Sequence, residues 1–519
     1  MKKAIYLIIA LIGLSAPSCS DSMLDFSPTD SGSGKELLKS ASTAITSVNG
    51  VYRSMWTAGW STTANTHQCF GIAAYNLALD CMADDLIMQS QGNGWFWGDH
   101  CYNVKSNYTS SAFRSYDVWY ANYKWIANVN YIIDAEPEMA GTEADVAYVA
   151  GQAYAIRALC YLNLATWFSR APYNSLTGAS RWNEPCVPVY TTGTSIDTGG
   201  QPRESLRTVY GRIDQDIDRA IELLEKARET TLAENNKSHI NLYVALGIKS
   251  RACLAEGDWD GAFKAAKRVI DEGGYAVGTK SDLTGGMNSL DKQNVMWGAG
   301  IQVADQAGGY AGFFTHMDNK EGAYAKSAPK LISKQLYNRI SATDIRRDWW
   351  DPSDKESPYV SKKFSFANVA SFPGDYIYMR VEEMYFTAAE AALRLDDLKS
   401  ARELMNTVMA ERDPGYSANN RSGTLLGATT TTWTGSFLEN ILTHRRIELW
   451  GEYGRLFDVR RLGQGIDRRT DDSFSEECIS MMNRRNVNIT KADTYDWVLT
   501  IPKAELDANP NINEEDQNP

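Results

Sequence analysis

Residues 376–414 read YIYMRVEEMYFTAAEAALRLDDLKSARELMNTVMAERDP, and two apolar patterns follow each other in this stretch. Both have the i, i+3, i+4, i+7 spacing that places side chains on one face of an α-helix. The first consists of Val381, Met384, Tyr385, Ala388, Ala391, Ala392 and Leu395, and the second of Leu398, Ala401, Leu404, Met405 and Val408. The polar break Asp396–Asp397 separates them, so the stretch predicts two helices that fold back on each other.

Residues 243–270 repeat this arrangement, with a turn at Gly257–Asp258 between two apolar stripes. Further amphipathic stretches are 41–56, 117–133, 149–168 and 206–227. A helix pair of this kind cannot bury its apolar face alone, so several pairs must stack to form a core. The sequence therefore predicts a mainly α protein with a tetratricopeptide-like scaffold. Residues 295–301 predict a short strand in which Trp297 belongs to the core.

Two regions are rich in aromatic residues and lack a helical period. Residues 60–101 contain Gly92-Asn93-Gly94-Trp95-Phe96-Trp97-Gly98-Asp99, and residues 304–325 contain Tyr310, Phe313, Phe314, His316 and Tyr324. Aromatic side chains flanked by glycines are poorly placed to pack a helical core. The first region is either a loop that covers its own aromatic side chains or an exposed stacking platform, and we favour the platform. The second region interrupts the helical repeats, and we expect binding function in such an insertion.

The N-terminus has the features of a targeting segment. Lys2–Lys3 precede an apolar run over residues 4–14 that is too short to span a bilayer, and small residues lead to Cys19. We expect residues 1–18 to be a signal peptide, Cys19 to be lipidated, and residues 19–40 to be a polar tether. We expect residues 41–519 to form one domain, in which 41–235 carry the first aromatic loop and 236–519 the later repeats.

The net charge and the cysteine count argue against two classes of protein, nucleic-acid binders and disulfide-stabilised scaffolds. A net charge of −12 argues against binding to nucleic acid. Seven cysteines follow Cys19, an odd number that does not indicate a disulfide framework. Three of them, Cys69, Cys81 and Cys101, lie near His67 and His100, but their spacing fits no standard zinc pattern. For these three cysteines the alternatives are simple burial, a disulfide and a metal site. Burial or a disulfide is favoured over a metal site.

Residues 438–462, LENILTHRRIELWGEYGRLFDVRRL, alternate charged and apolar side chains. This favours a partly buried ion-pair network over an acid–base catalytic cluster, and Glu448 could meet His444, Arg445 or Glu452 within one turn. A glycoside hydrolase needs two separated carboxylates, whereas Asp84–Asp85 are adjacent. No Ser/His/Asp set, HExxH motif or phosphate-binding loop is present in the sequence. We therefore expect no enzyme and no cofactor.

Taken in order, several landmarks resemble the SusD/RagB family of outer-membrane nutrient-binding lipoproteins of Bacteroidetes. They are Cys19 followed by LDFSPTD, the spacing of Trp119, Tyr123, Ile126 and Asn130, GDWDGAFKAAKRVI, MRVEEMYFTAAEAALRL, RRIELWGEYGRLFDVRRLG, and the ending IPKAEL, ANPNI and QNP. The family commonly has Glu-Gly-x-Arg where this chain has Glu452-Tyr453-Gly454-Arg455. The resemblance implies a SusD-like fold, in which four helix pairs support a less regular, loop-rich half with a few short strands.

The same resemblance implies the function. Members bind glycans at the cell surface, deliver them to a SusC-like TonB-dependent transporter, and are anchored in the outer membrane by lipid. Flat aromatic side chains suit the C–H face of a sugar ring. The residues predicted to bind glycan are Trp95, Trp97, Tyr310, Phe313, Phe314, Tyr324, Asn93, Asp99 and Asp318. The alternatives are a binder of another nutrient such as peptides, a surface glycoside hydrolase, and a helical-repeat adaptor for proteins.

Overall fold

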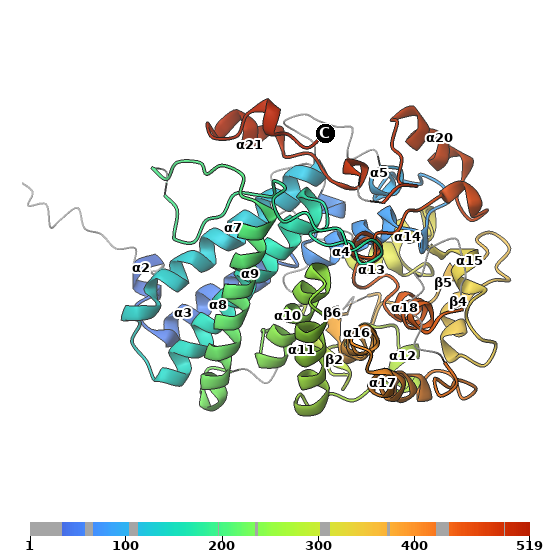
Figure 1. Cartoon of the computed structure of the whole chain (residues 1–519), viewed down its shortest axis with the longest axis horizontal. Coiled ribbons are helices and arrows are strands. Elements are labelled where there is room, and N and C mark those ends of the chain that lie inside the picture. Colours follow the sequence, from blue (N-terminus) through green and yellow to red (C-terminus); the bar gives the residue numbers. More distant parts are fainter. Residues whose placement is uncertain are drawn as a thin grey trace, which may run out of the picture.

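The computed structural model describes residues 34–57, 66–102, 113–195, 197–233, 237–301, 312–370, 374–421, 435–492 and 494–519. Over these residues the chain is mostly helical, with a few short strands (Figure 1). The predicted mainly α class is confirmed. Cys19 and Tyr310 lie outside the described residues.

The longer helices form the scaffold. They are α3 (Ala41–Ser54), α4 (Ile72–Met82), α7 (Phe113–Ala135), α8 (Glu143–Phe168), α9 (Leu206–Lys226), α10 (Leu242–Glu256), α11 (Trp259–Glu272), α16 (Val381–Arg394), α17 (Leu398–Ala410) and α18 (Phe437–Glu448). The shorter ones are α2 (Gly34–Leu37), α5 (Trp97–His100), α12 (Lys280–Thr284), α13 (Phe313–Met317), α14 (Ala323–Ser327), α15 (Lys334–Tyr337), α19 (Arg455–Arg461), α20 (Glu476–Arg484) and α21 (Lys503–Ala508). Three helices correct the sequence analysis, because α4 and α5 lie in residues 60–101 and α13 in residues 304–325, where no helical period is present.

Local capping fixes where the scaffold helices begin and end. The side chains of Thr142, Ser205 and Asn241 accept hydrogen bonds from backbone N–H groups in the first turns of α8, α9 and α10. Helix α10 ends at Gly257, whose φ of 78° is left-handed, and Asp258 then caps α11. The turn predicted at Gly257–Asp258 is therefore a helix stop followed directly by a helix start.

The helices stack in sequence order, as the paired pattern predicts. Helix α7 packs on α8, α8 on α9, α10 on α11, α11 on α16, and α16 on α17. Figure 1 shows α7 to α9 on the left, α10 and α11 in the centre, and α16 and α17 at the lower right. Ala388, Ala391 and Ala392 of α16 are fully buried, so small side chains let the helices approach closely. The tetratricopeptide-like scaffold is confirmed.

Short strands connect the scaffold to the irregular half. Strand β2 (Val295–Ala299) pairs antiparallel with β6 (Tyr376–Arg380), which leads directly into α16. A second sheet has the order β1-β3-β5-β4, formed by Leu86–Ile87, Leu331–Ile332, Val360–Ser361 and Trp350–Asp351. Trp297 is buried, as predicted, and its indole N–H donates to the Ser238 carbonyl at 3.2 Å.

The ionic segment forms a buried ion-pair network, as the sequence predicts, but the partners of Glu448 differ from those expected. Its carboxylate pairs with Arg346 at 3.0 Å, Arg380 at 2.9 Å and Arg412 at 2.9 Å. Neighbouring Arg445 pairs instead with Asp458 at 2.8 Å. Glu448 points into the core where three segments distant in sequence converge, so local helix spacing could not identify its partners.

Asp84 and Asp85 also belong to this ionic core. Asp84 pairs with Arg446 at 3.0 Å and with Arg455 at 3.1 Å. The Asp85 carboxylate contacts both arginines as well, so the pair ties the end of α4 to α18 and α19.

The cysteines of the described residues, Cys69, Cys81 and Cys101 among them, are buried. None of the described helices combines the length and the apolar character needed to cross a membrane.

Candidate functional site

The turn at residues 92–97 presents Trp95 on one side and turns the following residues inward. Gly92 has a φ of 51°, and a Cβ there would lie 2.6 Å from the Ser327 carbonyl oxygen, so glycine allows the turn to approach α14. Phe96 has a left-handed φ of 61°. Trp95 is partly exposed, whereas Phe96 and Trp97 are buried.

His67, Trp95 and Tyr324 form one cluster of rings, here called the aromatic cluster. The His67 and Trp95 rings stack with centroids 4.8 Å apart at 19°. Tyr324 meets Trp95 edge-on at 5.9 Å and meets His67 at 5.6 Å. The two aromatic regions predicted from the sequence therefore do meet. Figure 1 shows α5, α13 and α14 gathered at the right of the view.

Hydrogen bonds hold the cluster in place. The Tyr324 hydroxyl and Nδ1 of His67 share a hydrogen bond at 2.5 Å. Nε2 of buried His316 lies 2.6 Å from the His67 carbonyl oxygen, which can only accept, so this nitrogen carries the proton. Burial first and nearby Lys330 second lower the pKa of His316 to about 3. The imidazole beneath the cluster is thus neutral at physiological pH.

Three predicted aromatic contacts are buried, which corrects the expectation that they face outward. Trp97 is 3% exposed, Phe313 8% and Phe314 1%. Trp97 packs on His100, while the two phenylalanines pack on Tyr376. The glycine spacing predicts irregular loops here, but Trp97 begins α5, and Phe313 and Phe314 begin α13. These short helices pack against the core, which the spacing does not predict.

The two predicted acidic contacts are also occupied within the fold. Asp99 is fully buried and forms two hydrogen bonds with Arg114, at 2.7 and 3.0 Å. Asp318 is 3% exposed and accepts backbone hydrogen bonds from Lys320, Glu321 and Phe366 at 2.9 to 3.0 Å. Both carboxylates shape the loops around the cluster and do not face solvent.

Asn93 is exposed beside the cluster, where its side-chain oxygen accepts a hydrogen bond from the Ser327 hydroxyl. Of the predicted contacts within the described residues, Asn93, Trp95 and Tyr324 thus lie together with partial or full exposure. His67 is the member that sequence reasoning missed, because it was weighed only as a metal ligand. Among the described residues, no group of three or more His, Cys, Asp or Glu could hold a metal ion.

This arrangement suits recognition by stacking. The indole of Trp95 is a flat apolar surface that stacks on His67, and Asn93, two residues earlier in the same turn, adds an exposed amide. Such a surface fits a ligand that has an apolar face and a polar rim, as a sugar ring has. Because both predicted acidic contacts are buried and hydrogen-bonded, the cluster has no pair of carboxylates from these residues facing each other across a cleft.

Solved structures share this fold. A SusD-like carbohydrate binding protein from Bacteroides vulgatus ATCC 8482 is 24% identical, with a TM-score of 0.72 over 92% of this chain and 98% of that one. A SusD superfamily protein from Bacteroides thetaiotaomicron VPI-5482 is 22% identical, with a TM-score of 0.73 over 92% and 100%. Surface glycan-binding protein A from Bacteroides thetaiotaomicron, in complex with laminarihexaose, is 16% identical, with a TM-score of 0.61 over 92% and 99%.

Family models match the sequence itself at both ends of the described fold. The SusD family matches residues 332–519, and the family described as "Starch-binding associating with outer membrane" matches residues 43–254. Among curated proteins, none matches this sequence. The two family matches do not overlap and together span more than half of the chain, and the protein belongs to the SusD family.

Proposed function

We propose that this protein binds an oligosaccharide or polysaccharide at the cell surface through the aromatic cluster and passes it to a SusC-like TonB-dependent transporter. One observation carries the proposal: Trp95 and Tyr324, 229 positions apart in the sequence, meet in a partly exposed cluster outside the helical core. A stacked sugar would cover the face of the Trp95 indole, and Asn93 would meet a ring hydroxyl.

Family membership supports the ligand class. A protein of the same fold, surface glycan-binding protein A, has been solved with laminarihexaose bound. An acidic chain with a net charge of −12 also suits neutral sugars better than anionic ligands.

The cellular place and the partner belong to the same proposal. Residues 1–18 would act as a signal peptide, and Cys19 would carry the lipid that tethers the domain of residues 41–519. The description "associating with outer membrane" of the matched family supports this location. A transporter that accepts the captured glycan would dock on the same domain.

Affinity electrophoresis through gels containing single polysaccharides tests the proposal. We expect one glycan class to retain the wild-type protein. Trp95→Ala should weaken that retention at least tenfold, because a lost stacking contact of about 1.4 kcal/mol corresponds to a factor of ten. Trp97→Ala should act only through stability, since this indole is buried.

Trp259→Ala is the matched control. Trp259 is also a partly exposed tryptophan, but it lies on α11 against Arg394 and Tyr173. It should leave retention unchanged. Equal retention of Trp95→Ala and wild type would refute the role of the cluster. If peptides retain the protein in the gel and no glycan does, the ligand is a peptide and not a saccharide. Release of reducing ends from a glycan would indicate a hydrolase.

A further inference from the structure

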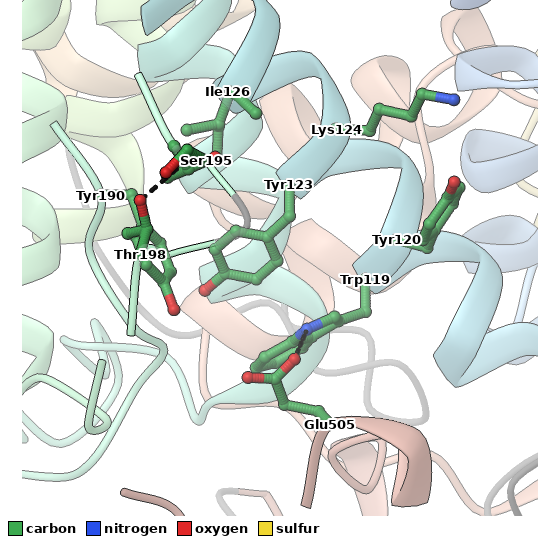
Figure 2. Close-up of a pocket in the computed structure, with 11 residues that line it drawn as sticks. Trp119, Tyr120, Tyr123, Lys124, Ile126, Tyr190, Ser195, Thr198 and Glu505 are labelled. Carbon is green, nitrogen blue, oxygen red and sulfur yellow. Dashed lines mark hydrogen bonds between the residues drawn. The ribbon is translucent and has the colours of Figure 1, made fainter. Parts of the chain in front are cut away.

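A pocket of about 420 Å³ lies between α7, α21 and the residues Tyr190, Thr194, Ser195 and Thr198, and it shares no residue with the aromatic cluster. Figure 2 shows its lining side chains, which come from three segments far apart in the sequence. The volume lies within the range of sites that enclose small organic ligands, about 300–1,000 Å³.

The floor of this pocket is made of three aromatic rings. Trp119 and Tyr123 are successive contacts on α7, with centroids 4.9 Å apart, and Tyr190 meets Tyr123 edge-on at 5.9 Å and 89°. Figure 2 shows the Tyr123 ring between the rings of Tyr190 and Trp119. The Tyr123 hydroxyl donates to the Pro188 carbonyl at 2.8 Å, which fixes the ring. The rings touch one another, so they form a continuous surface and do not sandwich a ligand.

The scaffold holds residues 190–193 of the segment that walls the pocket. Asn130 donates to the carbonyls of Tyr190 at 3.2 Å and Thr192 at 2.9 Å, and Arg157 donates to the Thr191 carbonyl at 2.9 Å. The Gly193 N–H donates to Asp134 at 2.7 Å. A ligand would therefore bind without the loss of conformational entropy that ordering these four residues would require.

Helix α21 supplies the carboxylate at the edge of the floor. Glu505 accepts a hydrogen bond from the Trp119 indole N–H at 3.2 Å and another from Asn509 at 2.8 Å, and it remains partly exposed. An ionised carboxylate has further acceptor positions beyond these two. The other charged residue of the described lining is Lys124, whose Nζ lies 5.5 Å from the centroid of the Tyr120 ring. In Figure 2, Lys124 and Tyr120 point away from Tyr190.

We infer that this pocket is a second saccharide site that takes one neutral sugar unit, such as a chain end or a branch. The aromatic floor meets the C–H face of a pyranose, and Glu505 accepts hydrogen bonds from its hydroxyls. A carboxylate beside the floor disfavours uronic acids by like-charge repulsion. The inference rests on the proposed glycan-binding function and adds a site that the aromatic cluster does not provide.

The test uses the mature protein carrying Trp95→Ala, so that the aromatic cluster does not contribute. Methyl glycosides of glucose, galactose and mannose, together with glucuronate, are titrated by saturation-transfer NMR. Ala127→Trp should fill the pocket, since Ala127 lines it. Asn128→Trp is the matched control, because the next residue on α7 is exposed and lies outside the pocket lining.

We expect at least one neutral glycoside to bind more tightly than glucuronate. Ala127→Trp should weaken that binding at least tenfold, and Asn128→Trp should leave it within twofold. Glu505→Gln keeps the shape of the side chain and should weaken binding about five- to tenfold, because a charge-assisted hydrogen bond becomes a neutral one. If Ala127→Trp does not fold, Glu505→Gln is the variant that tests the inference.

The failures of the two proposals are distinguishable. If Trp95-dependent retention of a polysaccharide is seen but no methyl glycoside binds the pocket, the further inference is wrong and the proposed function stands. If glycoside binding depends on Ala127 while Trp95→Ala does not affect polysaccharide retention, the role of the aromatic cluster is wrong. Binding of N-acetylphenylalaninamide that Ala127→Trp abolishes, without binding of any glycoside, would make the pocket a peptide site and overturn the inference.

Discussion

Replacing Glu448 with glutamine tests whether the buried ionic core stabilises the fold. Four buried carboxylates meet four buried cations there: Asp344, Glu382, Glu448 and Glu452 face Arg346, Arg380, Arg412 and Lys363. The Glu448 side chain is 0% exposed and contacts three of the arginines at 2.9 to 3.0 Å. Glu448→Gln removes one negative charge and leaves an excess positive charge in the core.

We expect this change to lower the free energy of unfolding by about 3–5 kcal/mol, the usual cost of breaking a buried ion pair from one side. The loss should not be larger, because each arginine keeps another carboxylate: Arg346 keeps Asp344 at 2.6 Å, Arg380 keeps Glu452 at 2.6 Å and Arg412 keeps Glu382 at 2.7 Å. Urea denaturation followed by circular dichroism measures the difference. Glu403→Gln, at an exposed pair with Lys399, is the control and should change stability by less than about 0.5 kcal/mol.

The pH dependence separates lost charge from lost packing. Burial by itself raises the pKa of Glu448, but Arg412, Arg380 and Arg346 hold that pKa well below its ordinary value. A depressed folded-state pKa stabilises the protein above the unfolded pKa, about 4.3, and this stabilisation is lost as pH falls toward the folded value. The advantage of wild type over Glu448→Gln should therefore be constant near pH 7 and shrink below about pH 4.3. A difference under about 1 kcal/mol at pH 7, or one that is unchanged at pH 3, would refute the reasoning.

Three further changes test other parts of the fold by denaturation. Trp97→Ala should cost about 3–5 kcal/mol, because this side chain is 3% exposed; a neutral result would mean that the indole is not core. Gly257→Ala should cost about 2–3 kcal/mol, since its Cβ would lie 2.4 Å from Tyr173 at a φ of 78°, whereas Gly178→Ala, left-handed but with open space around it, should cost about 1 kcal/mol; equal costs would exclude the Tyr173 clash. Burial and the negative charges of Asp214 and Asp258 raise the pKa of Glu256 to about 8. The contribution of Glu256 to the free energy of unfolding therefore falls as pH rises from about 4.5 to 8. Glu256→Gln should therefore stabilise by about 1–2 kcal/mol at pH 8.5 and by little at pH 4, and a gain at pH 4 alone would contradict this.

The scaffold could be predicted from the sequence because its determinants are local. The two stripes predicted in residues 376–414 correspond to α16 and α17, and the break at Asp396–Asp397 includes the residue that caps α17. Leu395 of the first stripe is an exception, because it follows α16 and is 43% exposed, and α16 itself is buried on almost all sides. The partners of Glu448 could not be predicted in the same way. Arg346, Arg380 and Arg412 come from separate segments, so their meeting depends on tertiary packing alone.

The candidate site was located by composition but not resolved residue by residue. Aromatic residues without helical period identified both segments, and the structure brings Trp95 and Tyr324 from them into contact. The composition does not predict which neighbours face outward, because this depends on backbone angles and tertiary packing: Phe96 has a positive φ, and Phe96 and Trp97 are both buried. His67 has no periodic or compositional signal in the sequence, and only its ring contacts place it in the cluster.

The most direct test of glycan binding by the aromatic cluster is a crystal structure of the protein soaked with an oligosaccharide of the class that retains it in affinity gels. We predict a sugar ring stacked on the Trp95 indole, with Tyr324 and Asn93 in contact with the same ligand. An ordered oligosaccharide elsewhere on the protein, with the Trp95 face uncovered, would contradict this.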